Sequence, residues 1–495
     1  GIRDVERSRG LGDVYKRQSW LRSLKIGKGD RVAVMLTNCP EFMEIYLACS
    51  RLGAIFVPIN FRLAGPELDY ILHNCRPRLF IFGADYMEEI EAFSLARPTG
   101  EMFLASIGIS SGLNGIMDYH GEMESVAEPL TGGEIPGPAD PEEPQVIMYT
   151  SGTTGRPKGA VLSHRKTFFN CLNADIFFKL HFDDIMLIVL PLFHSGGLFI
   201  QASPILYKGA TMIIHPRFDP HRVYREINRH KVTKFLGVPT VYRSLLKVPP
   251  ESRGDLSSLK VCAIGGEKTT VELLKRCKEA EFPLRQIMGQ TETSILLWAS
   301  EEDSIRKPGT VGRPVFHAEV ALVDRGGQPV KPGDVGEIVV RGSIMMTEYW
   351  EDPRRTAETI KGGWLHTGDL ARVDEDGYFY LVDRVKDMIN VSGFKVYSTT
   401  VDSVLFQHPG IAQAVTIGVP DPDRPGSERV KAFIVLKNAY KDKLSMDEII
   451  DFCKQKLPPY AVPTSVEFRD SLPMTVSEKL FKRRLREEEI SKMKK

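Results

Sequence analysis

Short apolar runs alternate with amphipathic segments along most of the chain, and this alternation constrains the fold more than any other feature. Strands that alternate with helices form parallel sheets whose faces are covered by helices. A loop-rich stretch at residues 112–144 interrupts the rhythm, which then resumes. We predict strands at residues 31–37, 54–57, 79–82, 145–149, 184–190 and 211–215, and helices at residues 41–52, 66–74, 221–230 and 271–281. The chain is therefore expected to have an α/β fold.

The pattern changes near Gly312, where short apolar runs are separated by turns instead of helices. Strands at 320–324 and 337–341 predict a small antiparallel, barrel-like subdomain. After Arg384, about 110 residues follow with an α+β rhythm, a length suited to a small domain. We predict helices there at 401–408 and 446–456, and strands at 412–419 and 431–436.

The opening stretch, residues 1–18, shows little apolar periodicity and lacks an initiating Met. We interpret it as a non-native or truncated leader, with a natural N-terminus as the alternative. The expected domains are then 19–384 and 385–495. A length of 495 residues supports more than one structural unit.

Charge and cysteine content exclude several classes of protein. The chain has 65 Lys and Arg against 64 Asp and Glu, a net charge of +1, so a dedicated nucleic-acid binder is disfavoured. Seven cysteines, an odd number without a CxxC pair, argue against a zinc site or disulfide framework and suggest a reducing, cytoplasmic location. No apolar run approaches the roughly 20 residues of a membrane span.

The most informative motif is Tyr-Thr-Ser-Gly-Thr-Thr-Gly-Arg-Pro-Lys-Gly at residues 149–159, directly after a predicted buried strand. Its glycines allow tight turns with N–H groups pointing at a ligand, and its hydroxyls and Lys suit phosphate oxygens. The usual triphosphate P-loop is excluded because position 157 is Pro. A flexible surface hairpin is the alternative. The candidate phosphate-binding residues are Thr150, Ser151, Gly152, Thr153, Thr154 and Lys158.

Further motifs follow in a fixed order: Gly265-Gly266-Glu267, Gly289-Gln290-Thr291-Glu292, and the stretches 364–370, 382–387 and 472–480. Together with the phosphate loop, this series closely resembles adenylate-forming enzymes, the superfamily of acyl- and aryl-CoA synthetases, peptide-synthetase adenylation domains and firefly-type luciferases. The resemblance extends from about Gly27 to Leu485. It implies a large N-terminal domain of two parallel-type α/β subdomains plus a small β-barrel, followed by a small, mobile α+β C-terminal domain.

The resemblance also implies roles for individual residues. Thr291 would contact the α-phosphate, and Glu292 would help to hold Mg²⁺, which accepts a hard carboxylate oxygen beside phosphate. Asp369 and Arg384 would reach the ribose hydroxyls, and Lys386 would be the hinge between the domains. Lys479 would stabilise charge during adenylation, although it also lies in a basic stretch. The remaining candidate nucleotide-site residues are Gly265, Gly266, Glu267, Gln286, Met288, Gly289 and Gln290.

The implied reaction begins when a carboxylate attacks the α-phosphate of ATP, giving acyl-AMP and pyrophosphate. Positioning and charge neutralisation dominate such a step. A rotation about Lys386 would then remove Lys479 and bring up Ser392, Gly393, Phe394 and Lys395 as a tunnel for the thiol of CoA. Thiol attack would give a thioester and AMP. The expected cofactors and partners are ATP, Mg²⁺, CoA and a carboxylic acid, and a homodimer is left open.

Several residues bear on which acid is used. His194 stands where amino-acid-activating relatives carry Asp, which disfavours an α-amino acid, and a His here commonly lies beside the carboxylate. Gly289 stands where acetate-specific relatives place a Trp, so we expect an open pocket and favour a medium- or long-chain fatty acid over an aryl acid. Alternatives are an acyl-AMP ligase that serves a carrier protein or amine, a non-catalytic binding relative and a luciferase-like oxidase.

Three departures from the family pattern stand out. Met288 replaces the usual aromatic residue, Ser398-Thr399-Thr400-Val401-Asp402 replaces Pro-x-Glu-Val-Glu, and Glu478 replaces a frequent Gly. Met can still lie against the adenine face. The first two departures bear on nucleotide binding and on the thioester-forming arrangement.

Overall fold

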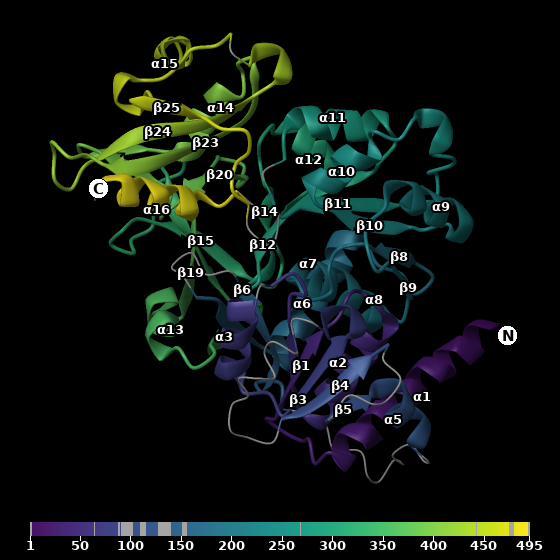
Figure 1. The fold of residues 1–495 in the computed structure, drawn as a ribbon. Coiled ribbons are helices and arrows are strands. Elements are labelled where there is room, and N and C mark those ends of the chain that lie inside the picture. The colour runs from purple at the N-terminus through teal and green to yellow at the C-terminus, as the bar shows by residue number, and fades with distance from the viewer. Residues whose placement is uncertain are drawn as a thin grey trace. The chain divides into compact units, whose positions relative to one another are not determined.

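The computed structural model describes residues 2–63, 65–87, 90, 102–108, 115–126, 140–150, 156–267, 269–441, 443–474 and 480–493. The chain divides into two compact units (Figure 1). The first unit comprises Gly1–Val320 and Val340–Leu365, and the second comprises Ala321–Val339 and His366–Lys495. The predicted boundary at residues 384/385 stays a proposal; the structure groups the segment from His366 to Arg384 with the second unit.

The first unit contains an eight-stranded sheet of order β17-β7-β6-β2-β1-β3-β4-β5. Its strands are β1 (Arg31–Met35), β2 (Ile55–Pro58), β3 (Leu79–Gly83), β4 (Phe103–Ile107), β5 (Ile116–Asp118), β6 (Pro144–Thr150), β7 (Lys158–Ser163) and β17 (Glu348–Tyr349). The pairings from β6 to β5 are parallel, whereas β7 and β17 are antiparallel additions at one edge. The helices are α1 (Ile2–Ser23), α2 (Pro40–Leu52), α3 (Gly65–Cys75) and α5 (Tyr119–Ser125).

A second sheet of the same unit has the order β14-β13-β12-β11-β10-β8-β9. Its strands are β8 (Ile185–Ile188), β9 (Thr211–Ile214), β10 (Lys234–Gly237), β11 (Val261–Gly265), β12 (Leu284–Gln290), β13 (Ser294–Ala299) and β14 (Arg313–Pro314). Strands β9 to β12 pair in parallel, and β13 and β14 add antiparallel. The expected parallel sheets are thus confirmed, with an antiparallel edge on each.

Helices precede, connect or follow the strands of the second sheet. They are α6 (His164–Phe178), α7 (Ser195–Gly197), the π-helix η2 (Leu198–Ala202), α8 (Ser203–Lys208), α9 (Pro220–His230), α10 (Pro239–Leu245), α11 (Val271–Glu279) and α12 (Glu301–Arg306). Figure 1 shows α10, α11 and α12 gathered beside this sheet. Helix α9 begins at the cap Asp219 and packs Val223, Tyr224 and Ile227 into the core, as their three- and four-residue spacing predicts.

The predicted antiparallel subdomain is a five-stranded sheet of order β15-β16-β19-β18, in which β20 also pairs with β19. Its elements are β15 (Glu319–Val323), β16 (Gly336–Arg341), β18 (Ile360–Lys361), β19 (Trp364–Val373), β20 (Phe379–Arg384) and the helix α13 (Pro353–Thr359). The α+β rhythm of the last part is also confirmed, and Ile389, Val401 and Ile434 lie in its core. Its elements are β21 (Ile389–Val391), β22 (Phe394–Val396), α14 (Ser398–Leu405), β23 (Ile411–Pro420), β24 (Glu428–Leu436), α15 (Met446–Lys454), β25 (Ser465–Phe468) and α16 (Lys482–Met493).

The N-terminal helix α1 makes specific contacts within the first unit. Arg17 is buried, donates a hydrogen bond to the Tyr119 hydroxyl at 3.0 Å and forms an ion pair with Glu44 at 2.7 Å. Trp20 packs edge-on against Tyr119. The interpretation of residues 1–18 as a leader stays a prediction.

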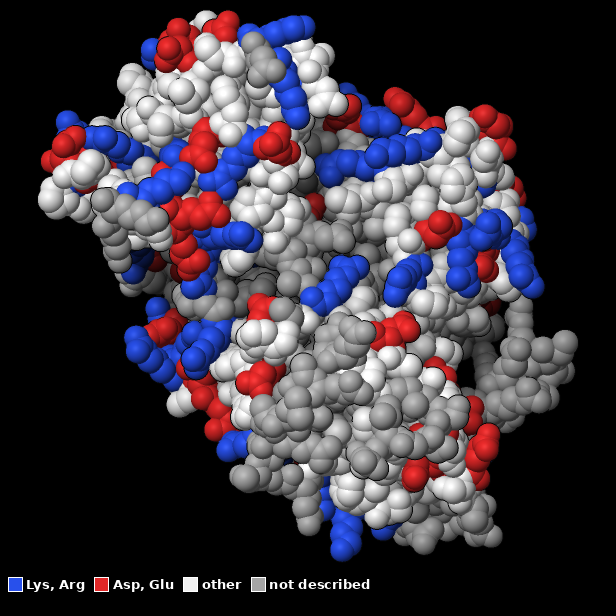
Figure 2. Space-filling model, viewed as in Figure 1, with Lys and Arg blue, Asp and Glu red and all other residues white. Residues whose placement is uncertain are grey.

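Charged side chains of both signs are interspersed on the face shown in Figure 2, in keeping with the net charge of +1. Within the described residues, no helix is both long enough and apolar enough to cross a membrane.

Candidate active site

The phosphate-loop motif connects two antiparallel strands at the edge of the first sheet. Strands β6 and β7 pair so that Thr150 lies opposite Lys158. Both residues are partly buried, and they close the base of the predicted loop. The loop residues Ser151, Gly152, Thr153 and Thr154 lie outside the described part of the chain. The structure therefore places the two ends of the candidate phosphate loop next to each other.

Lys158 lies beside Glu292, the candidate metal ligand. Its Nζ atom is 3.2 Å from Oε1 of Glu292, whose side chain is 9% exposed. Tyr349 donates a hydrogen bond from its hydroxyl to the same Oε1 at 2.8 Å, and the Lys158 amine also bonds to that hydroxyl. Burial raises the pKa of Glu292, but the nearby Lys158 and the Tyr349 hydrogen bond outweigh it, so the net pKa is lowered. The carboxylate is therefore held ionised.

The segment that carries Thr291 and Glu292 is a tight connection between β12 and β13. Thr291 is 7% exposed, and Thr293 and Ser294 are fully buried. Ser294 adopts a left-handed backbone with φ of 57°. Its hydroxyl accepts a hydrogen bond from the Lys166 amine of α6, which is completely buried. A buried hydrogen bond from α6 thus stabilises the connection between β12 and β13.

The backbone explains why residue 289 is a glycine, independently of the acyl pocket. A Cβ atom at this position would lie 1.7 Å from the carbonyl oxygen of Ser294, where the register of β12 and β13 shifts. No side chain fits without movement of that peptide. Likewise, a Cβ at Gly265 would lie 2.3 Å from the carbonyl oxygen of Ile287. The glycine at 289 therefore does not by itself report the length of the acid.

Other predicted nucleotide-site residues lie directly after β11 or within β12. Gly266 has a positive φ of 85° and is exposed together with Glu267. Met288 is 9% exposed. Gln286 is buried and donates a hydrogen bond from Nε2 to the carbonyl of Thr310 at 3.1 Å, a contact that anchors the following segment.

His194 is exposed and precedes helix α7. Its Nδ1 atom accepts a hydrogen bond from the Gly196 backbone at 3.3 Å. The preceding loop is fixed by Asn38, which sequence reasoning missed: it donates to the carbonyl of Leu190 at 2.9 Å and accepts from the backbone N–H of Leu192 at 2.8 Å. Asn38 is 152 residues away from the first of these partners, so no local sequence pattern signals it.

In the second unit, the predicted ribose-binding pair is brought together. Strands β19 and β20 place Asp369 opposite Arg384, and Nε of Arg384 lies 3.0 Å from Oδ1 of Asp369. Asp369 is buried, whereas the Arg384 side chain is 48% exposed. The carboxylate therefore has an ion-pair partner within its own sheet. The neighbouring hinge candidate, Lys386, accepts a hydrogen bond at its carbonyl from Arg486 of α16 at 2.6 Å.

The residues predicted to form the thiol tunnel lie at the β21–β22 hairpin. Ser392, Gly393, Phe394 and Lys395 are all exposed, and Ser392 and Gly393 have positive φ angles of 48° and 91°. Phe394 stacks on Tyr460 with ring centroids 4.6 Å apart. Lys479 lies outside the described residues, and Met474 and Leu480 on either side of it form an isolated antiparallel bridge.

The unusual Ser398-Thr399 sequence makes specific contacts. Ser398 is fully buried and donates a hydrogen bond to Oδ2 of Asp383 at 2.8 Å. It accepts one from the Lys482 amine at 2.7 Å, and Lys482 lies 3.4 Å from Asp402. The departure from the family pattern therefore ties the start of α14 to β20 and α16 within the second unit.

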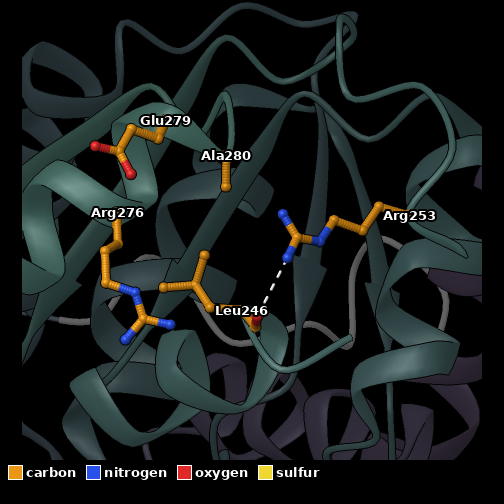
Figure 3. A pocket seen from close by; sticks show the side chains of 5 residues that line it. All are labelled: Leu246, Arg253, Arg276, Glu279 and Ala280. Atoms are coloured by element: carbon orange, nitrogen blue, oxygen red, sulfur yellow. Dashed lines mark hydrogen bonds between the residues drawn. The ribbon is translucent and has the colours of Figure 1, made fainter. Parts of the chain in front are cut away.

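A surface pocket shown in Figure 3 is separate from these residues. It is lined by Leu246, Arg253, Arg276, Glu279 and Ala280. Arg253 turns toward the backbone and donates a hydrogen bond to the carbonyl of Leu246 at 3.1 Å (Figure 3). None of the candidate site residues lines this pocket, so we do not assign it to the active site.

The fold and the order of these motifs define the class of the protein. The chain matches the AMP-binding enzyme family over residues 18–350 and the AMP-binding enzyme C-terminal domain over residues 400–479. The chain belongs to the AMP-binding enzyme family. The predicted superfamily and fold class are thereby confirmed.

Similar proteins narrow the class to acid–CoA ligases. The chain is 37% identical to feruloyl-CoA synthase of an Amycolatopsis species, covering 96% of this chain and 91% of the relative. It is 33% identical to indoleacetate–CoA ligase of Aromatoleum aromaticum, with coverage of 97% and 92%. It is also 33% identical to long-chain-fatty-acid–CoA ligase of Bacillus subtilis, with coverage of 97% and 89%. The protein is an acid–thiol ligase that acts on an acyl or aryl acid.

Solved structures of related enzymes have the same fold as this chain. ATP-bound MatB from Rhodopseudomonas palustris has a TM-score of 0.86 at 27% identity, covering 97% of this chain and 93% of that one. O-succinylbenzoate coenzyme A synthetase from Bacillus subtilis, in complex with ATP and magnesium ion, has a TM-score of 0.84 at 30% identity, with coverage of 97% and 94%. Both of these related structures hold ATP.

Proposed function

We propose that the protein activates an aromatic carboxylic acid with ATP and Mg²⁺, and transfers the acyl group from acyl-AMP to CoA. The observation that carries the activation step is the buried Glu292 carboxylate held by Lys158 at the base of the phosphate loop. The aromatic class rests on similarity to feruloyl-CoA synthase and indoleacetate–CoA ligase. Gly289 does not distinguish the two classes of acid, because the carbonyl of Ser294 leaves no room for a side chain there in either case.

The donor set fits a magnesium ion bound together with phosphates. Glu292 supplies an ionised carboxylate, a hard oxygen ligand, and Mg²⁺ is commonly held by one or two carboxylates plus substrate phosphates. Among the described residues, no cluster of three His, Cys, Asp or Glu could hold a metal alone. When bound, the ion would neutralise charge on the phosphate oxygens. Lys158 and Thr150 would contact phosphate oxygens from the loop, and Thr291 would position the α-phosphate.

The family resemblance supports further proposed contacts to the nucleotide. Asp369 would accept hydrogen bonds from the ribose hydroxyls, and Arg384 would hold that carboxylate in place. Lys479 would reach the α-phosphate during adenylation. A rotation about Lys386 would then exchange Lys479 for Ser392, Gly393, Phe394 and Lys395 at the thiol path. The substrate carboxylate would lie beside His194, whose loop Asn38 fixes.

A medium- or long-chain fatty acid is the second candidate substrate. One observation favours it, the 33% identity to the long-chain-fatty-acid–CoA ligase. Both classes share the same activation chemistry, because the acid differs only beyond its carboxylate. CoA is the proposed acyl acceptor in both cases. The alternative is an acyl-AMP ligase that transfers the acyl group to a carrier protein.

Pyrophosphate release separates these candidates. The full-length chain would be given ATP, Mg²⁺ and one acid at a time, from a panel of hydroxycinnamic, indole and benzoic acids and of short-, medium- and long-chain fatty acids, each with and without CoA. We expect release with an aromatic acid that rises with CoA. Preference for a fatty acid would instead identify the second candidate as the substrate class. Release without a CoA effect would favour a carrier-protein acceptor.

A further inference from the structure

Tyr349 lies beside the two charged residues of the candidate phosphate and metal site, although no sequence motif singled it out. It is 2% exposed, and its hydroxyl donates to Oε1 of Glu292 at 2.8 Å. The Lys158 amine lies 4.1 Å from the centre of its ring. The three side chains come from β17, β7 and the β12–β13 connection, and Tyr349 is 57 residues from Glu292 and 191 from Lys158 in sequence.

The backbone around Tyr349 is fixed on both sides of this cluster. Strand β17 pairs with β7, and the Trp350 N–H donates to the carbonyl of Gly159, the neighbour of Lys158. On the other side, the Met346 N–H donates to the carbonyl of Glu292 at 2.7 Å. The Tyr349 N–H donates to the hydroxyl of Thr356 at 2.9 Å. The segment 346–350 therefore connects the phosphate-loop strand directly to Glu292.

We propose that Tyr349 is a positioning residue that orients the Glu292 carboxylate for the nucleotide-bound metal ion. This inference rests on the proposed metal role of Glu292. A carboxylate that binds a metal is itself oriented by hydrogen bonds, and loss of such a partner typically lowers metal affinity 10- to 100-fold. The Tyr349 hydroxyl is a donor of this kind, and its ring is held by a strand.

Tyr349 suits this role better than Lys158, which contacts the same oxygen. Lys158 is proposed to contact phosphate oxygens, and a lysine amine on a four-carbon stem changes partners readily. A buried phenol has only two side-chain torsions and keeps its direction. When Lys158 turns toward a phosphate, the Tyr349 hydrogen bond still fixes the rotation of the Glu292 carboxylate.

The test measures metal binding rather than turnover. Tyr349→Phe removes the hydroxyl but keeps the ring beside Lys158. Binding of Mn²⁺ in the presence of ATP would be measured on the full chain from the electron paramagnetic resonance signal of the free ion. We expect 10- to 100-fold weaker Mn²⁺ binding in Tyr349→Phe, with metal-free AMP affinity within twofold of the parent. The matched control is Tyr380→Phe, which deletes a similar phenol–carboxylate bond to Asp374 in the second unit and should leave Mn²⁺ affinity unchanged.

A double-variant cycle tests whether the effect passes through Glu292. Tyr349→Phe should add less than twofold to the loss already caused by Glu292→Gln. Unchanged Mn²⁺ affinity in Tyr349→Phe, or a full additional loss in the Glu292→Gln background, would overturn the inference. An equal loss of metal-free AMP affinity would also overturn it, because it would indicate general damage to the site. Parental Mn²⁺ affinity in Glu292→Gln alone would instead remove the metal role of Glu292 from the proposed function, and this inference with it.

Discussion

The buried Lys166 provides a sharp test of the electrostatics beneath the candidate site. Its side chain is fully buried on α6, and its amine donates a hydrogen bond to the Ser294 hydroxyl and lies 5.4 Å from the ring of Phe199. Burial lowers the pKa of Lys166 to about 7, although the negative charge of Glu292 partly opposes the shift. The perturbation that we consider is Lys166→Met, which keeps an unbranched side chain of similar length but removes the ionisable amine.

The sign and size of the effect follow from proton linkage. The folded pKa of about 7 lies below the ordinary lysine pKa of 10.5, so between these values the unfolded chain carries more protons than the folded one. The free energy of unfolding of the parent therefore rises with pH across this window, by up to about 1.4 kcal/mol per pH unit. Because the amine is half protonated near pH 7, the rise between pH 7 and 9 is about 2 kcal/mol.

All four tryptophans, Trp20, Trp298, Trp350 and Trp364, belong to the first unit, so tryptophan fluorescence reports its unfolding. Urea unfolding of the parent and of Lys166→Met would be compared at pH 7, 8 and 9. We expect the stability of Lys166→Met relative to the parent to fall by about 2 kcal/mol from pH 7 to 9. Ser294→Ala, which removes the hydroxyl acceptor of the amine, should destabilise the parent most at pH 7. Parallel pH profiles of the parent and Lys166→Met would refute the reasoning.

Three further predictions concern single substitutions. Asn38→Ala leaves two backbone groups of the loop before His194 unpaired, and we expect a loss of about 2 kcal/mol in urea unfolding and a raised KM for the acid. Asp369→Asn should raise the KM for ATP about tenfold, with the KM for the acid unchanged. Glu467→Gln should reduce the loss of stability of the second unit in acid, measured by circular dichroism between pH 5 and 2.

The pH prediction for Glu467 follows from its partners. Burial raises the pKa of this carboxyl, but hydrogen bonds from Lys431, Lys492 and Arg469 lower it to about 2, below the ordinary glutamate pKa of 4.5. Its stabilising contribution is therefore complete above pH 4.5 and disappears as the pH falls toward 2. An unchanged acid transition in Glu467→Gln would contradict this assignment. An unchanged KM for ATP in Asp369→Asn would contradict ribose binding, and parental stability of Asn38→Ala would contradict the role of its two hydrogen bonds.

Local sequence patterns predicted the repeating elements well. The strand at 31–37 and the helix at 41–52 are observed as β1 and α2, because apolar spacing and capping are properties of neighbouring residues. The pairing of Thr150 with Lys158 could also be predicted from local sequence, since both belong to one strand–loop–strand motif. The antiparallel edges formed by β13 and β17 were not predicted, because pairing partners are not specified by the strand's own composition.

By itself, the sequence determined the α/β class, the family and the order of the motifs that carry the chemistry, since each depends on residues close together in the chain. Only the tertiary structure decided which groups surround them. Tyr349 donates a hydrogen bond to Glu292, and the buried Lys166 donates one to Ser294. Asn38 accepts a hydrogen bond from the loop before His194. These contacts join residues 57 to 154 positions apart, and their energies depend on burial, which local sequence does not specify. Gly289 illustrates the same limit, because glycine is required there by the carbonyl of Ser294 across the hairpin.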